Sequence, residues 1–127
     1  MDSHEAAAVV LVDTTGTIRY WSRGASTLFG HVDPVGRTLD VIIPEDYRAQ
    51  HWAGFHKAME TGVAEAAGGR YNIPINCADG HVRCFPGTFS LLCDGHGRAV
   101  GGIGTWTERT GDEQPFTPIE VSPDSSR

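Results

Sequence analysis

One long helical segment, lying between two β-rich blocks, constrains the fold of this chain more than any other feature. Pro44 followed by two acidic residues marks a helix start. Gly62 marks the end, which predicts a helix over about Glu45–Thr61. One face of this segment carries side chains at the i, i+4, i+7 and i+8 spacing of a buried stripe: Tyr47, His51, Phe55, Ala58 and Met59. The helix therefore has one face to bury, with His51 at its centre.

The segment before this helix predicts a hairpin and a short helix. Two β-rich runs, residues 9–12 and 17–21, flank a turn signal. Residues 24–29 are compatible with one or two helical turns, with Ala25, Leu28 and Phe29 on a buried face. Gly30 would end that short helix.

Three strands are predicted after the long helix: residues 71–77, 81–93 and 98–107. The first of them alternates, with Ile73, Ile75 and Cys77 on one side. Asp79-Gly80 is a hairpin-turn signal between the first two strands. Because proline has no backbone N–H, Pro86 in the second strand predicts a bulge or kink.

These elements predict a single α+β domain, in which a five-stranded antiparallel sheet carries short helices and one long helix on one face. The 127 residues leave room for one domain. From residue 111 the composition shifts to Pro, Asp, Glu and Ser. We therefore expect the domain to span residues 8–110 and residues 111–127 to form a disordered, acidic, Pro-containing C-terminal tail.

The charge pattern excludes several kinds of partner. The chain has 10 basic and 16 acidic side chains and a net charge of −6, without a cluster of Lys and Arg. Nucleic acids and anionic membranes both require such clusters. No apolar run approaches the length of a membrane span, and the first residues lack the positive flank of a signal peptide. We expect a cytoplasmic protein that binds neither nucleic acid nor membrane.

No catalytic or metal-chelating motif is present in the sequence. Cys77, Cys84 and Cys93 show no C-x-x-C spacing, which favours reduced thiols. His51 and His56 are five residues apart, about 140° around a helix, so they cannot share one metal ion. Nucleophile-elbow and phosphate-loop patterns are also missing. The sequence therefore predicts that the protein is not an enzyme.

Several short motifs, taken in order, resemble a PAS domain. They are an apolar-D-x-x-G-x-I opening at residues 12–18, A-x-x-L-F-G at 25–30, G-R-T at 36–38, I-P-E-D-Y-R at 43–48 and D-G at 79–80. Their joint occurrence from residue 8 to residue 110 is far more specific than any one motif. Two positions depart from the family pattern. Ser22 replaces a frequent asparagine and can still cap a helix, and the closing D-x-T is Glu108-Arg109-Thr110.

The resemblance implies a PAS fold, with the first strand central, the third strand at an edge and a pocket between the helices and the sheet. Family members hold haem, flavin, another chromophore or a small metabolite there, or pack the pocket with side chains. We expect a stand-alone sensory and signal-transduction module, a homodimer that signals by non-covalent contact to a partner protein in trans. The alternative is a ligand-free interaction and dimerisation module that regulates a partner kinase or transcription factor.

His51 indicates haem b as a candidate ligand, and a haem-binding domain of this kind would sense a gas or a redox state. The motifs are closest to those of the haem-binding oxygen-sensor PAS group, in which a histidine seven residues after the helix-opening proline is the proximal iron ligand. Pro44 and His51 have this spacing. Arg70 stands near the position where those sensors hold an arginine that responds to bound gas. The alternatives are a core histidine with satisfied hydrogen bonds and a solvated Arg70.

The expected pocket residues come from the long helix and the later strands: Tyr47, His51, Phe55, Met59, Arg70, Ile73, Ile75, Phe89, Leu91 and Ile103. Flavin-cysteinyl light sensing is not expected, because residues 76–79 fall in a strand and turn rather than on a helix. Trp21, Trp52 and Trp106 are expected to be packing groups or interface contacts. Trp52 is displaced from the His51 face, which makes it a candidate for an exposed anchor that contacts a partner.

Overall fold

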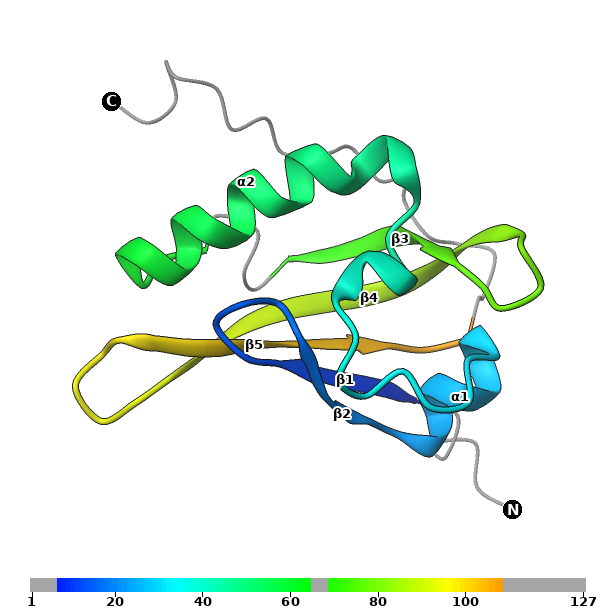
Figure 1. Ribbon diagram of the computed structural model, residues 1–127, viewed down its shortest axis with the longest axis horizontal. Helices are drawn as coiled ribbons and strands as arrows, with labels where there is room; N and C mark the ends of the chain where they lie inside the picture. Colours follow the sequence, from blue (N-terminus) through cyan, green and yellow to red (C-terminus); the bar gives the residue numbers. More distant parts are fainter. Residues whose placement is uncertain (1–6, 65–68, 109–127) are drawn as a thin grey trace.

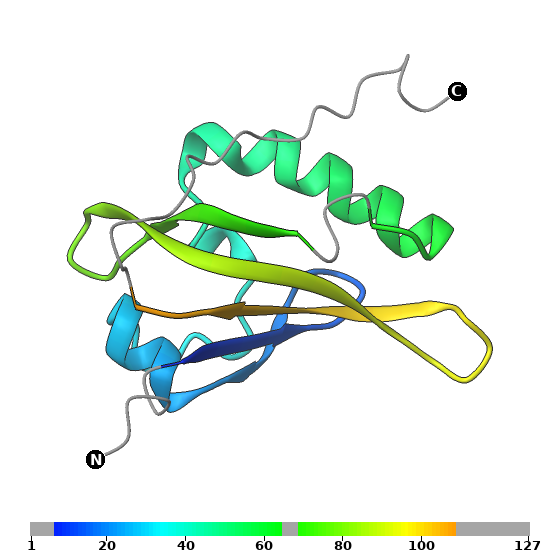
Figure 2. The ribbon, with the colours of Figure 1, turned by 180° about the vertical axis from the view of Figure 1, so that it is seen from behind.

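The fold is an antiparallel sheet with helices on one face, as seen in a computed structural model that describes residues 7–64 and 69–108 (Figure 1). The elements are β1 (Ala8–Val12), β2 (Ile18–Trp21), α1 (Arg23–Phe29), the short 3-10 helix η2 (Leu39–Val41), α2 (Glu45–Thr61), β3 (Arg70–Asn76), β4 (Val82–Cys93) and β5 (Ala99–Trp106). The strand order is β2-β1-β5-β4-β3. Seen from behind, the sheet shows a face that no helix of the described residues covers (Figure 2).

This arrangement confirms the α+β architecture predicted from the sequence. Helix α2 has the predicted bounds and ends at Gly62, whose φ is 76°. Strand β3 lies at a sheet edge as expected, whereas the middle strand is β5 and β1 lies beside it. The predicted tail over residues 111–127, and the last two residues of the closing motif at 108–110, lie outside the described residues.

Ser22 joins the first strand to the first helix. Its Oγ accepts hydrogen bonds from Ala25 N at 3.1 Å and from Val9 N at 2.8 Å. The first bond caps α1, because a hydroxyl oxygen satisfies one of the free N–H groups at a helix start. Gly30, with a φ of 88°, ends the helix and donates its N–H to Ser26 O. The short helix thereby buries Ala25 and Phe29 against the sheet, as predicted.

Trp52 joins α2 to the turn between β1 and β2 and is half-buried, so the expectation that its side chain is exposed is wrong. Its indole N–H donates to Asp40 Oδ1 at 2.7 Å. Its ring lies against Gly16, where an added Cβ would overlap it. Gly16 has a φ of 80°, a backbone conformation that also favours glycine. The side chain thus packs within the molecule, against the β1–β2 turn and beside Asp40.

Pro86 causes no bulge, contrary to the sequence prediction. The β3–β4 register runs without a break from Arg70 opposite Thr88 to Asn76 opposite Val82. The carbonyl of Pro86 accepts a hydrogen bond from Thr107 N at 3.0 Å. In an antiparallel ladder the N–H and C=O of one residue point to the same neighbour. The missing N–H therefore faces Thr107 too, one residue beyond the end of β5 at Trp106, so Pro86 forgoes only the reciprocal bond of this terminal pair.

Alanine at position 101 is expected to weaken the fold. A Cβ on Gly101 would overlap the carbonyl oxygen of Val12, which is backbone of the neighbouring strand. Strands β1 and β5 would have to separate, so we expect Gly101→Ala to lower the free energy of unfolding by about 2–3 kcal/mol in urea denaturation. Gly95→Ala is the control, because nothing lies within 4 Å of a Cβ there. If the two variants lost the same amount of free energy of unfolding, this account of the β1–β5 contact would be contradicted.

Candidate functional site

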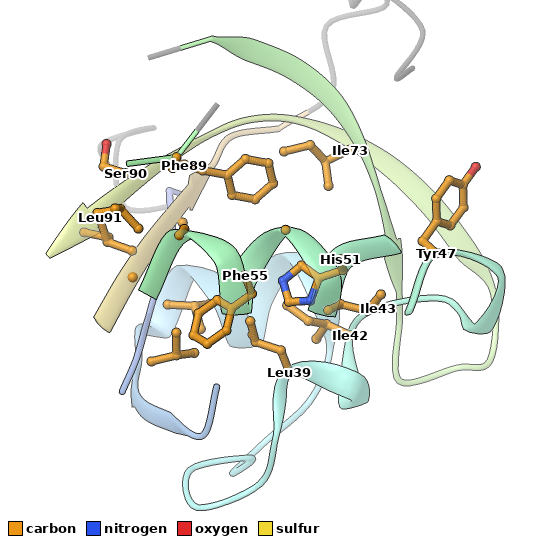
Figure 3. A pocket seen from close by; sticks show the side chains of 18 of the residues that line it. Leu39, Ile42, Ile43, Tyr47, His51, Phe55, Ile73, Phe89, Ser90 and Leu91 are labelled. Carbon is orange, nitrogen blue, oxygen red and sulfur yellow. The ribbon is translucent and has the colours of Figure 1, made fainter. Parts of the chain in front are cut away.

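A cavity of about 470 Å³ lies between α2 and the sheet (Figure 3). This volume falls within the range of about 300–1,000 Å³ that is typical of small-molecule sites. Its walls come from α2, the segment 39–44 before it, and strands β1, β3, β4 and β5. Most lining residues are apolar: Val10, Val12, Leu39, Ile42, Ile43, Phe55, Ala58, Ile73, Ile75, Phe89, Leu91, Ile103 and Trp106. The cavity is therefore suited to a largely apolar molecule.

Glycine residues keep this space open where α2 crosses the sheet. Gly54 of α2 and Gly102 of β5 both line the cavity. A Cβ on Gly102 would meet Val12, Ser90 and Phe55 at 3.6–3.9 Å, which is ordinary van der Waals contact. A larger residue would thus fit the backbone at position 102 and extend into the cavity. Glycine in a strand interior often marks the close approach of a ligand or another backbone.

His51 is a half-buried titratable residue of the cavity wall. Its ring packs edge-on against Trp52, with ring centroids 4.7 Å apart, and stacks on Phe55 at 5.9 Å. Its Nδ1 is buried without a hydrogen-bond partner. Burial lowers the pKa of His51 from 6.5 to about 4; the charge of Asp40 opposes this shift and His56 adds to it. The imidazole is therefore neutral at neutral pH.

The predicted pocket residues other than Met59 and Arg70 line the cavity: Tyr47, His51, Phe55, Ile73, Ile75, Phe89, Leu91 and Ile103. Figure 3 shows His51 and Phe55 close to Leu39 and Ile42, with Phe89 and Ile73 grouped apart from them. Tyr47 lies apart from the other labelled side chains, at one end of the group. The structure thus brings together side chains from both halves of the sequence.

Met59 and Arg70 are not lining residues. Met59 is rotated by roughly 80° from His51 around α2, away from the side on which Gly54 and Ala58 line the cavity. Arg70 begins the edge strand β3, is exposed, and donates from Nη2 to Thr107 Oγ1 at 3.3 Å. Arg70 is therefore a solvated side chain outside the cavity, which was the alternative to a gas-responsive residue.

The sequence interpretation missed the wall formed by the segment before α2. Leu39, Ile42 and Ile43 line the cavity, and Ile42 is only 2% exposed. Their signal in the sequence is an apolar run that ends at Pro44. Gly102 was missed as well, although a glycine within a predicted strand is itself an indication of close approach.

Two searches of the described parts of the chain, for clusters of metal-ligating side chains and for membrane-spanning helices, found none. Within residues 7–64 and 69–108, no group of three or more His, Cys, Asp and Glu side chains could hold a metal ion. No helix in these ranges is long and apolar enough to cross a membrane. The three cysteines are free; Cys77 is buried, Cys84 half-buried and Cys93 exposed. None of the three lines the cavity.

Comparisons with known proteins identify the fold. No protein-family model matches the sequence, and no curated protein matches it. The PAS domain of a protein from Colwellia psychrerythraea superposes with a TM-score of 0.70 at 19% identity, covering 85% of this chain and 90% of that one. The PAS domain of the quorum-sensing receptor RpfR from Cronobacter turicensis, in complex with C12:0, gives 0.60 at 15% identity, covering 83% and 95%.

A third solved structure extends the likeness to light-sensing relatives of this fold. The LOV domain of the blue-light photoreceptor Aureochrome1 superposes with a TM-score of 0.63 at 24% identity, covering 87% of this chain and 79% of that one. All three alignments cover most of both chains. The chain therefore has the PAS fold expected from its motifs.

Proposed function

We propose that this chain is a non-enzymatic PAS sensory module whose cavity binds a small, largely apolar molecule. The cavity itself carries the proposal. Protein interiors are normally packed as densely as organic crystals, and an apolar void lowers the free energy of unfolding through lost contacts. A largely apolar pocket of about 470 Å³ that is partly open to solvent is suited to a ligand that enters from outside and fills it. The RpfR PAS domain in complex with C12:0 is consistent with an apolar ligand.

The cavity also supports ligand sensing over the ligand-free alternative. That alternative requires a core filled by side chains such as Phe55, Phe89 and Leu91, yet these residues line an open space. A bound molecule would lie between α2 and β5, and α2 is held to the β1–β2 turn through Trp52. Ligand binding would thus change the balance between two positions of α2. A homodimer and a signalling partner protein in trans are part of this proposal, and the uncovered sheet face supports both.

Fluorescence of N-phenyl-1-naphthylamine, an apolar dye that brightens in dry sites, tests this function. The purified full chain is expected to bind the dye with about 1:1 stoichiometry. C12:0 is expected to displace the dye in competition. The proposed function would be contradicted if the dye fluorescence did not saturate, or if C12:0 did not reduce it.

Haem b was the cofactor suggested by the spacing of Pro44 and His51, and the surroundings of His51 do not fit it. An imidazole that ligates a metal almost always donates its other ring N–H to an acceptor, which holds the ring and fixes the tautomer. His51 Nδ1 has no such acceptor.

Cysteine-linked flavin also lacks its nucleophile, because no cysteine lines the cavity among the described residues.

An absorption spectrum distinguishes the two interpretations of His51. After incubation with haemin and removal of excess, we expect wild-type protein and His51→Ala to have the same weak absorption in the Soret region. The reason is that haem bound without an iron ligand from His51 does not depend on that side chain. A sharp Soret band in the wild type that His51→Ala abolishes would restore haem as the cofactor.

A further inference from the structure

Two unpartnered polar atoms belong to residues of the cavity wall. In residues 7–64 and 69–108, the buried side-chain atoms without a hydrogen-bond partner are His51 Nδ1, Asn72 Oδ1 and Trp106 Nε1. His51 and Trp106 line the cavity, whereas Asn72 does not. Buried polar groups are nearly always paired in folded proteins. The enclosed Nδ1 of His51 therefore carries information about which nitrogen of this ring a ligand can meet.

The unpartnered Nδ1 determines which nitrogen of His51 carries the proton. A neutral imidazole has one N–H donor and one nitrogen with a lone pair. Burying an N–H without an acceptor is costly, and unpaired donors are rarer in proteins than under-used acceptors. With Nδ1 enclosed and unpartnered, the favoured neutral form has its proton on Nε2. Because His51 lines the cavity while its Nδ1 is enclosed, Nε2 is the ring nitrogen left to meet a ligand.

We propose that His51 presents an Nε2–H donor to the cavity and that the ligand is an uncharged, largely apolar molecule with an oxygen acceptor, such as a medium-chain ketone or ester. This inference rests on the proposed function and names the ligand class of the same site.

The charge of Asp40 disfavours a carboxylate beside the His51 ring, whereas Lys57 is a cationic residue of the cavity wall. The carboxylate of Asp40 lies close enough for its charge to act on His51, and it would repel a second anion placed beside the ring. An anion would also lose its hydration in a cavity with mostly aliphatic and aromatic walls. A ketone or ester oxygen gives up much less hydration and still accepts the hydrogen bond.

A pair of probes, decan-2-one and n-decane, isolates the hydrogen bond. The two molecules have the same chain length and differ by one ketone oxygen. Affinities are measured by displacement of N-phenyl-1-naphthylamine from wild-type protein and from His51→Phe. We expect His51→Phe to lower the affinity for decan-2-one by about fivefold, which corresponds to one lost hydrogen bond. The affinity for n-decane should not change. His56→Phe is the matched control, because His56 is exposed on the same helix, and it should change neither affinity.

Nitrogen-15 NMR of the His51 ring tests the donor directly, without any ligand. We expect Nε2 to be protonated and Nδ1 to be bare at pH 7. A proton on Nδ1 would overturn the inference. So would an equal loss of affinity for decan-2-one and n-decane in His51→Phe, or a complex with decanoate that depends on His51 and is tighter than the complex with decan-2-one. If neither probe displaces the dye, the proposed function fails, and the ring tautomer alone decides whether His51 is a donor.

Discussion

Replacing Gly102 with leucine is expected to raise the dissociation constant of the cavity dye by more than about tenfold, equivalent to at least about 1.4 kcal/mol. The site has room for the new side chain, since a Cβ there makes only ordinary contacts with Val12, Ser90 and Phe55. The remaining atoms of leucine would occupy the cavity that Gly102 lines. Because filling a void restores lost contacts, the free energy of unfolding should rise by about 1 kcal/mol.

Val100→Leu is the matched control for this substitution. Val100 lies in the same strand, is 47% exposed and does not line the cavity. The control should leave both the dye affinity and the free energy of unfolding within about 0.5 kcal/mol of the wild type. If Gly102→Leu folds and still binds the dye as tightly as Val100→Leu, the dye does not occupy the cavity and the assigned site is wrong.

The free energy of unfolding is expected to fall by about 3 kcal/mol between pH 6.5 and pH 4 because of His51 alone. Burial lowers the pKa of His51 in the folded protein from 6.5 to about 4, against the opposing charge of Asp40. The unfolded chain therefore binds a proton at this residue through a pH range in which the folded chain does not. Protonation favours the unfolded state there, so stability is complete above pH 6.5 and is lost as the pH falls.

Urea denaturation at a series of pH values between 7 and 4 measures this effect. His51→Phe should remove the decline, and the control His56→Phe should retain it. The pKa of Asp13, lowered by the hydrogen bond from Thr15, and that of Asp79, lowered by Arg83, both lie below this range. These carboxyl groups therefore do not mask the histidine. Identical pH profiles for the wild type and His51→Phe would contradict a buried neutral imidazole.

Features governed by neighbouring residues could be predicted from the sequence. Pro44 and Gly62 bound α2 because the start and the end of a helix depend on local backbone chemistry. Ser22 caps α1 for the same reason. The periodicity of α2 placed His51 and Phe55 on the buried face, and both line the cavity. Local rules were therefore sufficient for the elements and for much of the helix side of the site.

Features that depend on distant parts of the chain could not be predicted in the same way. The effect of Pro86 is set by where β5 ends, about twenty residues later in the chain. The burial of Trp52 depends on Gly16 in a turn that belongs to the first hairpin. The role of Gly102 follows from its position opposite Val12 and Leu91, which requires the register of three strands. A single sequence does not specify these long-range contacts.

Methyl NMR during a titration with decan-2-one tests the central claim, that the cavity between α2 and the sheet is the ligand site. The account predicts saturable shift changes for methyl groups in the cavity wall, namely those of Val10, Ile42 and Ile73. The methyl groups of Val32 and Val100, which are exposed and outside the wall, should not shift. Shifts confined to Val32 and Val100, or no saturable shift at Val10, Ile42 and Ile73, would contradict the account.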